Sequence, residues 1–253
     1  MTRTNPKFTR IYVSGYDVSG VANNFGTAGF ETETDMVAAY SDEVKNTILG
    51  KQSVKCGPVN AFLSPSSSTG LHELFRPGSS IVDVLIAWGT SGVPVVGSPC
   101  FAWKMSQEGY QGGGEGIVPV TIPMPNAAYT APNGYVMPFG FLAHANGAET
   151  AANTGVATID AGASTAKGGV FVYQLLSSNG TVTLSLDHAS TNLNANFAAL
   201  TGATSGSINA SVTPKSGMVA LTSTLTVNRY IRWQLAFGTA TTATFVCAFL
   251  RGV

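Results

Sequence analysis

The sequence predicts a mostly β fold: a β-sandwich or barrel domain with one short helix, followed by a second, C-terminal β-sandwich domain. Three observations support this prediction. Short runs of residues alternate between apolar and polar side chains, which is the pattern of half-buried strands. Glycine is frequent, at 29 of 253 residues, and turn-forming residues separate the runs. Only 10% of residues are charged, against about 25% in an average domain, which excludes a coiled coil or a basic nucleic-acid binder.

The expected strands follow one another along the chain. Alternation is clearest at 81–88, 181–187 and 229–237, where every second side chain is apolar. Uninterrupted apolar runs at 170–176 and 243–250 are further expected strands.

Two tight turns are expected between neighbouring strands. Asn179 and Gly180 separate 170–176 from 181–187, and an Asn-Gly pair in that setting predicts a β-hairpin. The stretch that begins at Gly238 is interpreted in the same way between 229–237 and 243–250.

Helix signals are confined to two short segments. Residues 68–75 begin with a Ser/Thr cap and are followed by Pro77 and Gly78, so a short helix is expected there. Residues 34–40 give a weaker helical signal.

A change of composition at 145–168 suggests a boundary, because this stretch lacks aromatic residues and is rich in Ala, Gly, Thr and Asn. We expect a first domain at 1–150, a linker or long loop at 151–167 and a second domain at 168–253. A long insertion within one domain is the alternative, since loops of this length are uncommon.

Catalytic and metal-binding patterns are missing from the sequence. The three cysteines are widely spaced, which indicates reduced structural thiols rather than a disulfide framework or a metal site. The three histidines lack the partners that zinc requires, and no Gly-x-Ser-x-Gly motif is present. We therefore expect no enzymatic activity, no catalytic residue, no metal and no cofactor. Neither a signal peptide nor a membrane helix is expected.

Carboxylates cluster near the N-terminus. Glu31, Glu33 and Asp35 alternate, so they would share one side of a strand, and Asp42 and Glu43 form a second pair. Three interpretations stay open: a solvated strand face, the acidic lining of a channel, or the acid pair of a glycosidase.

The net charge of +0 conceals an uneven distribution. Residues 1–76 carry 7 basic and 7 acidic side chains, 77–165 carry one against five, and 166–253 carry five against one. A surface this poor in charge is hard to keep soluble as a monomer, so copies are expected to cover one another, with unlike segments in contact.

Three short motifs follow one another in the N-terminal part: the strand 10–20 (RIYVSGYDVSG), the spacing of Asp35, Asp42, Lys45 and Gly50, and the segment 70–74 (GLHEL). Their order resembles the major tail (tail tube) proteins of long-tailed bacteriophages. The segments 181–200 and 227–232 resemble small β-sandwich modules attached to phage virion proteins.

This resemblance implies a structural role in the virion tail, for a protein made in the host cytoplasm. Copies would form stacked rings around a bore through which DNA passes without sequence-specific binding. Other phage virion proteins would be partners, with no membrane and no cofactor. A loop at 36–56 would reach the neighbouring ring. Candidate bore or inter-subunit contacts are Glu31, Glu33, Asp35, Asp42, Glu43 and Lys45.

Two alternatives remain open from the sequence. One is another phage structural part, such as a head decoration, head–tail completion or baseplate protein. The other is a carbohydrate-binding β-sandwich, although Trp88, Trp103 and Trp233 are scattered rather than clustered. The C-terminal module would either sit outside the tube or act as a second tube domain.

Overall fold

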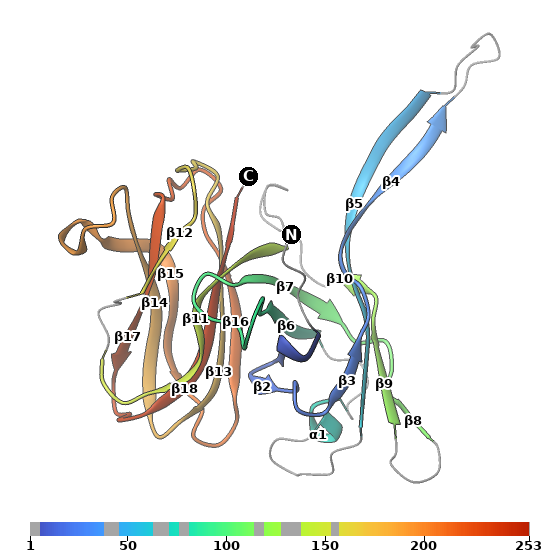
Figure 1. Ribbon diagram of the computed structural model, residues 1–253, viewed down its shortest axis with the longest axis horizontal. Helices are drawn as coiled ribbons and strands as arrows, with labels where there is room; N and C mark the ends of the chain where they lie inside the picture. The colour runs from blue at the N-terminus through green and yellow to red at the C-terminus, as the bar shows by residue number, and fades with distance from the viewer. Residues whose placement is uncertain are drawn as a thin grey trace.

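The computed structural model describes residues 6–37, 46–62, 71–75, 81–113, 119–127, 138–152 and 157–252. Within these ranges the chain forms three antiparallel β-sheets, so the prediction of a mostly β fold is confirmed (Figure 1). The α-helix of the described part is α1 (Leu71–Phe75), which falls inside the expected helix at 68–75. No helix in these ranges is long and apolar enough to cross a membrane.

The largest sheet has nine strands in the order β16-β13-β18-β11-β7-β6-β1-β2, with β10 beside β7. It takes strands from both expected domains, 1–150 and 168–253, because β11 pairs with β7 on one edge and with β18 on the other. The two segments therefore contribute to one continuous sheet. Its strands are β1 (Thr9–Val13), β2 (Tyr16–Asp17), β6 (Ile81–Trp88), β7 (Pro99–Ser106), β10 (Asn126–Ala127), β11 (Phe139–Glu149), β13 (Gly169–Ser178), β16 (Lys215–Ala220) and β18 (Ala243–Arg251).

Two smaller sheets cover the large one. The four-stranded sheet has the order β12-β17-β14-β15, and its strand β12 lies inside 151–167, so that segment is not simply a linker or loop. The five-stranded sheet has the order β3-β5-β9-β8, with β4 beside β5. Their strands are β12 (Thr158–Asp160), β14 (Thr181–Ala189), β15 (Ala198–Asn209) and β17 (Tyr230–Phe237), and β3 (Ala22–Phe25), β4 (Ala28–Val37), β5 (Asn46–Phe62), β8 (Gln111–Gly112) and β9 (Pro119–Met124).

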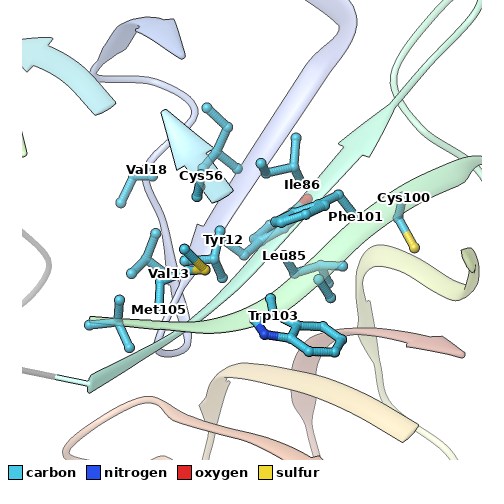
Figure 2. Packing of buried hydrophobic residues seen from close by; sticks show 14 of the residues in the cluster. Tyr12, Val13, Val18, Cys56, Leu85, Ile86, Cys100, Phe101, Trp103 and Met105 are labelled. Carbon is cyan, nitrogen blue, oxygen red and sulfur yellow. The ribbon is translucent and has the colours of Figure 1, made fainter. Parts of the chain in front are cut away.

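The strands β13 and β18 separate two hydrophobic clusters. Successive side chains of a strand point to opposite faces, so Val170 and Val172 of β13 belong to the first cluster, and Phe171 and Tyr173 belong to the second. The same division holds along β18. Figure 2 shows part of the first cluster, in which Tyr12 of β1 is opposite Leu85 of β6, and Ile86 of β6 is opposite Phe101 of β7.

The prediction of two β-hairpins is wrong, although the chain does turn at both positions. The strands β13 and β14 lie in different sheets, as do β17 and β18, so neither pair is hydrogen-bonded as a hairpin. Gly180 does not have the positive φ that an Asn-Gly hairpin turn of type I′ requires. The reason is burial: β13 and β18 have apolar neighbours on both faces, so each chain segment must leave its sheet to build the second layer.

The two turns instead connect the two sheets, and hydrogen bonds join one turn to the other. The Asn179 side chain accepts hydrogen bonds from the backbone N–H groups of Thr241 and Thr242 at 2.8 and 3.1 Å. The backbone N–H of Thr181 donates to Thr239 Oγ1 at 2.9 Å. These bonds satisfy polar backbone groups at the end of the sandwich that no ladder covers.

A polar junction joins the β1–β2 turn to the far side of the large sheet. Ser14 and Gly15 have φ values of +50° and +87°, so this two-residue turn is of the hairpin type. Gly15 donates its backbone N–H to the side-chain oxygen of Gln174, and Gln174 Nε2 donates to the carbonyl of Asp83 at 3.1 Å. A Cβ atom on Gly15 would lie 2.7 Å from Pro214, so only glycine fits.

Charged groups extend this junction. The Asp83 carboxylate pairs with Lys104 of β7 and accepts a hydrogen bond from Ser216 of β16 at 2.6 Å. The side chains of Asp83 and Gln174 are therefore buried with partners, as buried polar groups require. The junction therefore connects β6 and β7 with β13 and β16, which are not their neighbours in the strand order of the sheet.

Replacing Gln174 with Met tests the importance of the junction. Met keeps the approximate volume but leaves the Gly15 N–H without a partner in a buried site, while the Asp83 carbonyl keeps its second hydrogen bond, from the backbone N–H of Ser14. We expect the free energy of unfolding to fall by about 1–3 kcal/mol in urea denaturation, which is the cost of one unsatisfied buried group. Gln111→Met, at an exposed position, is the control and should change stability by less than about 0.5 kcal/mol. Equal stability of the two variants would contradict this assignment.

Candidate functional site

The histidines are held in structural environments. His72 Nδ1 lies 3.2 Å from the Tyr110 hydroxyl, and His188 Nδ1 accepts the backbone N–H of Asn228 at 3.2 Å. His144 is buried against Trp233 and Phe245, and this burial lowers the pKa of its imidazole. Over the ranges that the structure covers, no group of three or more His, Cys, Asp or Glu side chains is arranged to hold a metal ion.

The three cysteines are free and buried. Burial raises the pKa of Cys56 to about 12, and it also raises the pKa values of Cys100 and Cys247. Because the thiolate is the reactive form, these cysteines are held in the unreactive thiol state at neutral pH.

The most distinctive feature is an arm that projects from the body (Figure 1). The arm consists of residues 29–37 of β4 and 46–55 of β5, which pair with each other from Gly29–Lys55 to Val37–Asn46. The strand β9 pairs with β5 only from Cys56 onward. Within the described residues, no further strand is hydrogen-bonded along either long edge of the arm, although the short strand β10 lies close to β5 at its base. Such edges expose unpaired N–H and C=O groups that can accept a strand from another chain.

Two glycines bring the backbones together where the arm leaves the body. Gly57 donates its N–H to the carbonyl of Thr27, and Gly26 donates to the carbonyl of Pro58 at 3.1 Å. A Cβ on Gly57 would lie 2.5 Å from the backbone nitrogen of Thr27. Only the absence of a side chain allows this approach.

A hollow of about 580 Å³ opens at the base of the arm. Its walls are mainly apolar and include the buried residues Cys56 and Met124, while Pro123 and Pro125 supply no backbone N–H. The hollow therefore offers an apolar surface beside the two open strand edges.

The structure places one of the expected carboxylates in an ion pair. Glu31 lies on the arm and pairs with Lys55 across the two strands, and both side chains are exposed, at 66% and 50%. Surface pairs of this kind contribute little to stability. Lys55 is absent from the residues expected from the sequence, because finding this partner 24 residues away requires the strand register.

The other expected residues are only partly covered by the structure. Asp35 is opposite Ile48 in the ladder, and the register shifts between Thr32 and Thr34. At this shift two residues of β5, Gly50 and Lys51, are opposite the single residue Glu33 of β4, so the extra residue lies in β5. Asp42, Glu43 and Lys45 lie outside the described residues.

The expectation of a loop at 36–56 is wrong for most of its length. Residues 36–37 and 46–56 are strand, and 38–45 lie outside the described ranges. The expected helix at 34–40 is likewise wrong at 34–37, which is strand. In both cases pairing between β4 and β5 overrides the local signal, as tertiary contacts commonly do.

Neither known family models nor curated proteins match the sequence. Among solved structures, the crystal structure of phage SPP1 Dit (gp 19.1), a hub adsorption protein of phages that infect Gram-positive bacteria, shows a remote likeness. The two chains are 11% identical, with a TM-score of 0.31, over 95% of this chain and 98% of that chain. A likeness this weak does not establish a shared fold or function.

Replacing Gly57 with Ala tests the close approach at the base of the arm. The new methyl group would collide with backbone atoms of Gly26 and Thr27, so both strands must shift. We expect the free energy of unfolding to fall by about 1–3 kcal/mol, together with faster amide exchange in the arm. Gly29→Ala is the matched control, because nothing lies within 4 Å of its added Cβ. If both variants behave alike, the close approach has no structural importance.

Proposed function

We propose that this chain is a structural protein of a bacteriophage virion and, more narrowly, the tail tube subunit whose copies form stacked rings around a DNA channel. The order of N-terminal motifs supports this proposal, as does a sequence in which only 10% of residues are charged. Within this proposal, the protein acts in the tail of the virion, after synthesis in the host cytoplasm.

The arm is the observation that carries the proposal. A ribbon of two strands is marginally stable in water by itself. Contact with a second copy would pair its edges or cover its faces, so the arm is suited to join neighbouring subunits. The apolar hollow at its base adds surface that a neighbouring copy would bury.

The carboxylates of the arm would then serve the channel or the contacts between subunits. Glu31 is compensated by Lys55, which suits a contact that must avoid uncompensated charge. Glu33 and Asp35 are the candidates for the bore, where negative charge would let DNA pass without the counterion release that drives binding to basic surfaces.

Electron microscopy and analytical ultracentrifugation of the purified chain test self-assembly. We expect rings or tubes, with a larger assembled fraction at higher protein concentration. A strictly monomeric chain at high concentration would contradict the proposal. Assembly on capsids without rings or tubes would instead favour a head decoration protein, and the copy number per virion would separate the two.

A shortened chain tests the arm itself. Thr32 and Gln52 are opposite each other, so residues 33–51 can be replaced by an Asn-Gly turn that closes a two-residue hairpin. We expect the shortened chain to keep its thermal stability, because the described part of the removed segment pairs only within itself, and to lose assembly. Gly29→Ala should assemble like the unaltered chain. Normal rings from the shortened chain would show that the arm does not join subunits.

A further inference from the structure

A second concave site lies on the body, where the ends of four strands meet. Its floor is formed by Ile159 of β12, Ile231 of β17 and Phe249 of β18, all of which are buried. Phe139 and Phe141 of β11 form its rim and remain 38% and 43% exposed. The pocket has a volume of about 230 Å³, which suits a single aromatic or branched side chain, since a smaller apolar cavity of roughly 150 Å³ holds benzene.

One cation lies in this apolar wall. The Arg251 guanidinium donates to the carbonyl oxygens of Ala161, Val227 and Asn228 at 3.3, 2.7 and 3.2 Å. Its Nε atom is buried and has no hydrogen-bond partner. Among the described residues, no carboxylate pairs with it.

The charge of Arg251 is therefore uncompensated. Burial lowers the pKa of Arg251, which reflects the cost of holding a cation away from water. The guanidinium still remains charged at neutral pH, because its ordinary pKa lies above 12. Three of its five N–H donors bind carbonyl oxygens and the Nε–H is buried, so one N–H of Nη1 remains for an anion.

The surroundings of the pocket extend its apolar surface. The loop before β7 runs beside β11, where Gly97 donates its N–H to the carbonyl of Leu142 at 2.8 Å. Val93 and Val95 of this loop are 57% and 61% exposed. Clustered exposed apolar side chains on a soluble protein commonly mark an interaction site.

We propose that this pocket is a docking site for a partner protein that inserts an aromatic or branched aliphatic side chain next to a carboxylate. The apolar floor receives the side chain, and Arg251 binds the carboxylate through charge-assisted hydrogen bonds. Charge complementarity supports this occupant, because a carboxylate supplies the compensation that the described residues do not. The site does not depend on the proposed tail tube function.

Titration of the full chain with short capped peptides, followed by NMR, tests the proposal. The probe is a tetrapeptide with aspartate followed by phenylalanine between two glycines, and its matched forms carry asparagine for aspartate or alanine for phenylalanine. We expect shifts at Arg251 and Phe141, and binding at least about tenfold weaker for each matched peptide. Equal affinity for the aspartate and asparagine forms, or no binding up to about 10 mM, would overturn the proposal.

Two variants of the pocket and one control variant complete the test. Arg251→Gln removes the charge but keeps an N–H donor for the carbonyl oxygens, and we expect about tenfold weaker binding. Phe141→Ala removes part of the exposed rim and should weaken binding severalfold without unfolding the chain. Lys215→Gln removes the same charge from an exposed position and should leave affinity unchanged. If neither pocket variant weakens binding, the proposal fails. If the peptides do not bind but Arg251→Gln lowers self-association, the occupant is a second copy, and the proposal is again overturned.

Discussion

The strands β13 and β18 are covered by apolar side chains on both faces, and most of the fold depends on this burial. Each strand also has a neighbour on both edges, so these two strands form a wall shared by the two hydrophobic clusters. A wall of this kind requires nearly continuous apolar sequence, as at 170–176 and 243–250. Because β13 and β18 already have neighbours on both edges, the chain crosses between the two sheets at 179–180 and 238–242 and does not form a hairpin there.

The surfaces available for interaction lie where this burial ends. The inner half of β5 covers the first cluster through Cys56, Val59 and Ala61, and β9 pairs with it there. The side chain of Val54 still packs against this cluster, and from there the outer half of β5 continues as the arm, paired with β4 in the described ladder. The pocket at Arg251 likewise lies at the edge of the second cluster, where β11, β12, β17 and β18 meet.

The sequence allows several of the strands to be predicted, but not their partners. Alternation identifies 181–187 and 230–237 because those strands have one buried and one wetter face. It cannot assign 170–176 to a sheet, since a strand buried on both faces has no polar side to orient it. The pairing of Glu31 with Lys55 and the setting of Arg251 depend on register and on contacts between distant segments, which periodicity does not encode. Gly57 and Pro58 resemble turn residues in the sequence, yet they lie within β5 at a shift of register.

Both hydrophobic clusters depend on the shared strands β13 and β18, so we expect the two clusters to unfold together. Trp103 lies in the first cluster and Trp233 in the second, so each can report on its own side. The direct measurement is urea unfolding followed by fluorescence in two variants, each retaining one of these tryptophans with the others replaced by phenylalanine. We expect a single transition in each variant, with coincident midpoints once each variant's own stability change is subtracted. Two well-separated transitions, with one cluster still folded after the other has melted, would contradict this expectation.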